Sequence, residues 1–107
     1  MKKLLILLLL VPHLALADNV IFFGYAGQRC DSMISLNEDK TKQKQIEEYI
    51  KAFISGMNLA NYQSINSTIE NLYESSMKYC EDNPDHLFAI ALGKIYLSSE
   101  TKSLDNL

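Results

Sequence analysis

The spacing of apolar residues predicts helices along most of the chain. Between Thr41 and Leu59, apolar side chains recur three and four positions apart, with lysine, glutamine and glutamate between them. This is the pattern of a helix with one buried face. Its apolar stripe consists of Ile46, Tyr49, Ile50, Phe53, Ile54 and Met57. Gly56 lies inside the stripe and indicates either the close packing of a neighbouring element or the end of the helix.

Three further helices are predicted around this one. Cys30–Leu36 forms a helix of one to two turns. Another starts at Ser67, whose hydroxyl can cap the helix. The glutamate three residues later can reach back to the backbone N–H of this serine. A last helix over residues 84–97 starts with Asn83 as its cap and Pro84 at its first position. The buried stripes of these two helices are Ile69, Leu72, Tyr73, Ser76 and Cys80, and Leu87, Phe88, Ala91, Leu92, Ile95 and Tyr96.

These elements predict an all-α fold. We expect a small orthogonal bundle of four helices, one of them short, over residues 29–98. Residues 18–28 contain a short Val-Ile-Phe-Phe run followed by glycines, and we interpret them as an irregular lead-in. Residues 99–107 are polar and are expected to form a flexible tail. No internal repeat or interdomain linker divides the chain.

The first 17 residues have the composition of a secretory signal peptide. Lys2 and Lys3 supply a positive region, residues 4–11 form an apolar run, and an Ala-x-Ala triplet ends at Ala17. The apolar run is much shorter than the roughly 20 residues that span a bilayer, so a transmembrane anchor is the weaker interpretation. We expect cleavage between Ala17 and Asp18 and export to the periplasm.

Removal of the signal peptide makes the chain more acidic. Residues 1–17 hold two of the ten basic side chains and none of the thirteen acidic ones, so the formal charge changes from −3 to −5. Such a surface disfavours nucleic acid, and the membrane after cleavage, because both favour clusters of lysine and arginine. A basic protein partner suits it better. The remaining residues are enough for one domain with a modest core.

Cys30 and Cys80 are the two cysteines of the chain. An even number in an exported protein usually forms disulfides, and two cysteines allow one intramolecular pairing. Closing this loop should stabilise the fold by roughly 4 kcal/mol in the chain-entropy model. A redox-catalytic pair is the weaker interpretation, because the two cysteines lack the C-x-x-C spacing. We therefore predict a structural disulfide.

Few residues are candidates for catalysis or cofactor binding. His86 has acidic neighbours, but a disulfide-bonded cysteine cannot complete a zinc site with it, and we interpret it as a solvated residue in the first turn of a helix. The pairs Glu47-Glu48 and Glu70 with Glu74 lie on predicted solvated faces, with no apolar pocket to raise a pKa. No catalytic triad order or phosphate-binding glycine loop is present. We expect no cofactor, no metal and no enzymatic activity.

A polar segment between the second and third predicted helices is a candidate for partner binding. Aromatic side chains often anchor protein interfaces, and this loop carries one. The candidate residues are Asn58, Asn61, Tyr62 and Asn66. The broad apolar face of the last helix would suit a homodimer interface as well as a core.

Three segments resemble a set of small exported bacterial proteins. They are Gly27-x-x-Cys30, then Tyr49-x-x-x-Phe53-Ile54-Ser55-Gly56-Met57-Asn58, then Tyr79-Cys80-Glu81-Asp82-Asn83-Pro84 followed by Ala89 and Ala91. This set includes the HdeA/HdeB-type periplasmic acid-stress chaperones and the Rap/Tai-type immunity proteins, which neutralise peptidoglycan amidases delivered by type VI secretion. Members of known activity bind proteins without catalysis. The resemblance therefore implies a protein partner, but it identifies no individual contact residue.

The resemblance leaves three functional hypotheses. An acid-stress chaperone, slightly favoured by cysteine spacing and acidic composition, would loosen at low pH and bind client proteins. An immunity protein would bind one basic lytic enzyme in its folded state, and the Ser-Gly-x-Asn segment resembles this type more closely. A structural or accessory envelope protein is the third hypothesis.

Overall fold

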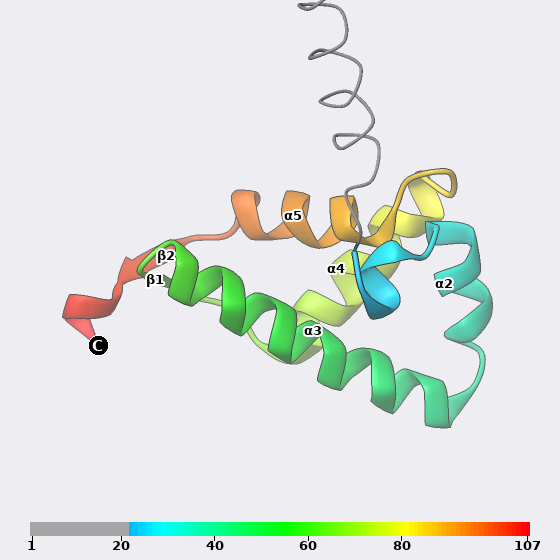
Figure 1. Cartoon of the computed structure of the whole chain (residues 1–107), viewed down its shortest axis with the longest axis horizontal. Coiled ribbons are helices and arrows are strands. Elements are labelled where there is room, and N and C mark those ends of the chain that lie inside the picture. Colours follow the sequence, from blue (N-terminus) through cyan, green and yellow to red (C-terminus); the bar gives the residue numbers. More distant parts are fainter. Residues whose placement is uncertain (1–21) are drawn as a thin grey trace, which may run out of the picture.

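The computed structural model describes residues 22–107. The predicted signal peptide and its cleavage point between Ala17 and Asp18 lie outside the described residues, as does the first part of the predicted lead-in. In the described part, the helices are η1 (Gly24–Gly27), α2 (Cys30–Leu36), α3 (Lys40–Ala60), α4 (Ile69–Asp82), α5 (Phe88–Ser98) and η2 (Leu104–Asn106), and the strands are β1 (Gln63–Ile65) and β2 (Thr101–Ser103) (Figure 1). The predicted all-α class, with four α-helices of which one is short, is confirmed.

The longest helix, α3, has the apolar stripe that its sequence predicts. It begins after Asp39, whose carboxylate accepts hydrogen bonds from the backbone N–H groups of Thr41 and Lys42 and so caps the helix. Its fully inward positions are Ile46, Ile50 and Ile54. Gly56 marks neither a close contact nor a helix end, because α3 continues to Ala60 and nothing lies within 4 Å of where a Cβ would stand.

The lead-in is held against α3 by hydrogen bonds of two tyrosines. The Tyr25 hydroxyl donates to Gln45 Oε1 of α3 (3.1 Å). The Tyr49 hydroxyl donates to the carbonyl of Phe23 (2.6 Å) and accepts from the backbone N–H of Ala26 (3.1 Å). Ala26, in the 3₁₀-helix η1, is buried. The segment that was predicted to be irregular therefore contains a short helical turn that packs on the core.

The predicted cap of the third helix is wrong by one residue. Thr68, not Ser67, is the cap: its Oγ1 accepts from the backbone N–H of Asn71 (3.2 Å), and α4 begins at Ile69. The delay has a physical cause, because the backbone N–H of Asn66 donates to the carbonyl of Glu100 (2.8 Å) and keeps this stretch extended.

The predicted start of the last helix is also wrong. The helix α5 begins at Phe88, and Pro84 lies in a loop before it. The carbonyls of Pro84 and His86 accept from the backbone N–H groups of Asp31 (2.9 Å) and Cys30 (2.7 Å). The loop thus satisfies two N–H groups at the start of α2, which otherwise lack partners within the helix.

Two strands replace the predicted loop and the predicted flexible tail. The strands β1 and β2 pair in antiparallel fashion, with Gln63 opposite Ser103, Ser64 opposite Lys102 and Ile65 opposite Thr101. Residues 99–107, which the sequence predicts to form a flexible tail, thus contain the strand β2 and the 3₁₀-helix η2. The segment is short and polar, and its order comes from pairing with residues almost forty positions earlier, which its own composition does not signal.

The predicted disulfide between Cys30 and Cys80 is confirmed. It joins α2 to α4 with 4.6 Å between the two Cα atoms, and both cysteines are fully buried. The core around it combines residues of all four α-helices and β1, and its members are Cys30, Met33, Ile46, Ile50, Ile54, Ile65, Leu72, Met77, Cys80, Phe88, Ala91, Leu92 and Tyr96. The apolar face of α5 belongs to this core.

Candidate protein-binding surfaces

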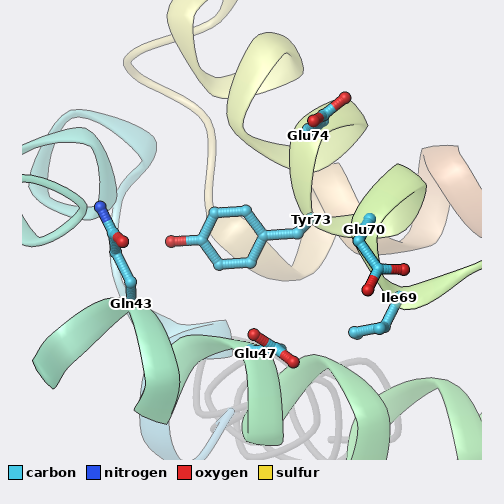
Figure 2. A pocket seen from close by; sticks show the side chains of 6 residues that line it. All are labelled: Gln43, Glu47, Ile69, Glu70, Tyr73 and Glu74. Carbon is cyan, nitrogen blue, oxygen red and sulfur yellow. The ribbon is translucent and has the colours of Figure 1, made fainter. Parts of the chain in front are cut away.

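A hollow between α3 and α4 is lined by acidic side chains. Its volume is about 230 Å³, and its lining residues are Gln43, Glu47, Ile69, Glu70, Tyr73 and Glu74. We call it the acidic groove. Figure 2 shows Glu47 pointing into the space from α3, while Glu70 and Tyr73 extend towards it from α4. The three carboxylates have no basic side chain among the other lining residues.

The wall of the groove is anchored by Asn37, at the end of α2. The Tyr73 hydroxyl donates to Asn37 Oδ1, and the Gln43 Nε2 donates to the Asn37 carbonyl at 2.6 Å. Burial raises the pKa of the Tyr73 phenol, and the nearby negative charge of Glu47 adds to the shift. The phenol therefore stays neutral and remains a hydrogen-bond donor at physiological pH.

The acidic side chains of the groove are only partly compensated. Glu47 Oε1 lies 3.6 Å from Lys51 Nζ on the same helix, and that lysine is closer to Glu48, at 3.0 Å. The hydrogen bond with Glu48 raises the pKa of Lys51. Among the described residues, no ion pair involves Glu70 or Glu74. The groove thus keeps an excess of negative charge.

This geometry can accommodate a cationic side chain. The groove is open to solvent, and the charged groups of its lining are the carboxylates of Glu47, Glu70 and Glu74. A lysine or arginine side chain could place its charge among the carboxylates, with its stem against Ile69 and its cation near the Tyr73 ring. The sequence places these glutamates on solvated faces but does not show that two helices bring them together.

The sequence predicts His86 in the first turn of a helix, and this prediction is wrong. His86 lies in the loop before α5, half-buried, and its Nδ1 is 2.8 Å from the Tyr79 hydroxyl. In the part of the chain that the structure describes, no three histidine, cysteine, aspartate or glutamate side chains are grouped to hold a metal ion. The imidazole is instead a hydrogen-bond partner within the fold.

The predicted partner-binding loop is divided between structural and exposed residues. Asn58 lies in α3, and its Oδ1 accepts from the backbone N–H of Ile65 (3.2 Å). Asn61 donates to the carbonyl of Met57 (2.8 Å), and the backbone of Asn66 extends the strand pairing. These three asparagines therefore help to build the turn between α3 and α4.

Tyr62 is the aromatic residue of this segment, and it lies at the surface. It is 56% exposed, and its φ of 52° lies in the left-handed region, which bulky residues rarely adopt. Its hydroxyl donates to Asp105 Oδ1 (2.7 Å), which raises the pKa of the phenol. The hydrogen bond holds the ring at the end of the molecule.

Exposed apolar side chains lie at the end of the molecule that carries Tyr62 and the two strands. The helices α3 and α5 both run towards the two strands (Figure 1). Leu59 near the end of α3, Leu97 near the end of α5, and the terminal Leu107 are 73%, 82% and 77% exposed. We call these three residues, Tyr62 and the two strands the strand end. A second hollow, of about 370 Å³, lies here against β1, β2 and Leu107.

Comparison with known proteins adds no assignment to this geometry. No helix of the described residues combines the length and the apolar character needed to cross a membrane. Searches with this chain against protein-family models, curated proteins and solved structures find no match.

Proposed function

We propose that this chain is a non-enzymatic periplasmic protein that binds a basic partner protein in its folded state. The acidic groove is the observation that carries the proposal. The carboxylates of Glu47 and Glu70 line it from facing helices, beside the apolar surface of Ile69 and the ring of Tyr73, and the Glu74 carboxylate points away from this space (Figure 2). A hollow of this kind fits a lysine or arginine from a partner. The net acidic charge of the chain would also speed the approach of a basic protein.

An immunity protein is the form of this function that we favour. A peptidoglycan amidase that carries a basic side chain at its surface could be held and inhibited by a rigid, disulfide-bonded binder. The core that holds the two walls of the groove contains, apart from Ser76, only apolar side chains and the disulfide. A folded binder needs this rigidity, because ordering a flexible surface on binding costs free energy.

A quantitative capture experiment tests the proposal. The oxidised mature protein is immobilised beside the variant E47Q/E70Q/E74Q and the control variant E81Q/D82N/D85N, which loses the same charge at exposed positions outside the groove. We expect an exported basic enzyme to bind the parent and control proteins, and the groove variant to bind it at least about tenfold more weakly. Equal binding to all three baits, or capture of no envelope enzyme, would contradict the proposal.

The acid-stress chaperone is a second candidate, and the charge of α3 favours it. This helix carries four lysines and two glutamates, and its ion pairs are internal. Strong acid neutralises carboxylates in general but leaves ammonium groups charged, so the lysines of α3 would repel one another and the other basic groups at pH 2. Separation of α3 would expose the buried faces of Ile46, Ile50 and Ile54 to clients.

Acidification distinguishes the two candidates. Circular dichroism, fluorescence of the dye ANS and a client-aggregation assay are compared at pH 7 and pH 2. New dye binding with suppressed aggregation only at pH 2 would support the chaperone. The immunity protein instead binds its basic partner at pH 7 and releases it at pH 2, because strong acid neutralises carboxylates in general. An unchanged fold at pH 2 without client protection would eliminate the chaperone.

A further inference from the structure

One edge of the two-stranded sheet has no partner in the described part of the chain. Hydrogen bonds run from the backbone N–H of Asn66 to the carbonyl of Glu100 (2.8 Å) and from that of Leu104 to the carbonyl of Tyr62 (3.3 Å). In an antiparallel ladder, hydrogen-bonded and non-hydrogen-bonded pairs alternate. The backbone groups of Thr101 therefore point away from β1, towards solvent.

The outward edge of β2 is accessible to another strand. Thr101 and Lys102 are exposed, and no hydrogen bond to a described residue uses the backbone N–H or carbonyl of Thr101. The backbone is already extended at Ser99, with φ of −85° and ψ of 148°, so the straight segment is longer than the three paired residues. Such an edge is a template for pairing with a further strand.

We propose that two copies of this protein associate through their β2 edges, antiparallel and centred on Thr101. Thr101 of one copy then lies opposite Thr101 of the second copy. In this register Glu100 lies opposite Lys102 of the second copy, and the symmetry repeats the pair. The two opposite-charge pairs stand on the same face of a four-stranded sheet.

The charges select this register over its neighbours. If Thr101 were opposite Ser103 of the second copy, the two Lys102 side chains would face each other, which is destabilising. If Ser103 were at the centre, Lys102 would face Leu104 and no opposite charges would pair. The edge is therefore self-complementary in one register, which favours a second copy as its occupant.

Exposed apolar residues beside the edge support the same interface. Leu107 lines the hollow of about 370 Å³ together with Thr101 and Lys102, and Leu97 lies four residues before Thr101. Both leucines are more than three-quarters exposed in the single chain. The sequence instead suggested the apolar face of the last helix as a dimer interface, but Phe88 and Leu92 of that face are buried in the core.

Charge reversal tests the proposal in the oxidised mature protein. Sedimentation equilibrium should show a dimer for the parent protein, and a dissociation constant at least about tenfold higher for E100K or K102E, because each turns two attractive pairs into two repulsive ones. An equimolar mixture of E100K and K102E should form a heterodimer, and the double variant E100K/K102E should dimerise like the parent. The control K94E, in α5, should leave the dissociation constant unchanged.

A cysteine cross-link tests the register. Directly opposed residues of a hydrogen-bonded pair have Cα atoms about 5.5 Å apart, which a disulfide can bridge. On mild oxidation T101C should form a covalent dimer, whereas S103C should not. A parent protein that stays monomeric at every concentration, a mixture that behaves like its separate components, or equal cross-linking of the two cysteine variants would overturn the proposal. These outcomes do not depend on partner capture by the acidic groove.

Discussion

At the scale of single residues, Asn58 shows how a side chain of one helix can fix the strand that follows. Its Oδ1 accepts the backbone N–H of Ile65, whose own side chain is buried in the core. We expect N58A to lower the free energy of unfolding by about 1–3 kcal/mol, because the Ile65 N–H loses its acceptor in a partly buried place. Urea denaturation of the oxidised protein measures this change.

Asn61 provides the matched control for this substitution. It is also an asparagine in the same turn, but its side chain is exposed and only donates to the carbonyl of Met57. The variant N61A should change the free energy of unfolding by less than about 0.5 kcal/mol. Equal losses in N58A and N61A would mean that the Asn58 hydrogen bond does not specifically stabilise β1.

At the scale of elements, the sequence predicts what local periodicity determines. The short helix from Cys30 to Leu36 and the stripe of α3 follow from apolar spacing, because the same residues that form these helices also face the core. The starts of α4 and α5 and both strands depend on backbone hydrogen bonds between distant segments. The bond from Asn66 to Glu100 is one example, and no residue pattern near Asn66 announces it.

Gly56 gives a prediction at the same scale. It lies exposed inside α3, and nothing stands within 4 Å of where a Cβ would be added. We expect G56A to raise the free energy of unfolding by about 0.5–1 kcal/mol, because alanine has the higher helix propensity. Thermal and urea denaturation measure the gain.

Gly24 is the contrasting position. Its φ of +69° favours glycine, and an added Cβ would come within 2.7 Å of the Tyr49 ring. The variant G24A should therefore destabilise the protein, whereas G56A should stabilise it. A G56A protein that is less stable than the parent would show that the glycine has a role in α3 that its surroundings do not reveal.

At the scale of the whole molecule, the candidate site arises from packing between helices. Glu70, Tyr73 and Glu74 share one side of α4 through their three- and four-residue spacing, which the sequence displays. Glu47 joins them only because α3 crosses α4 at this level. The sequence therefore identifies the acidic residues but not the groove, since the relative placement of two helices depends on the complete core.

The disulfide and the loop before α5 together hold α2, the shortest α-helix of the described residues, against the rest of the fold. Seven residues are too few for a stable isolated helix. We expect the double variant C30A/C80A to lose about 2–5 kcal/mol of unfolding free energy, because the unfolded chain is no longer closed between α2 and α4. Hydrogen exchange should then quicken most at the N–H groups of Cys30 and Asp31, which donate to the loop carbonyls. If these two amides stay as protected as in the oxidised protein, the loop alone suffices to hold α2.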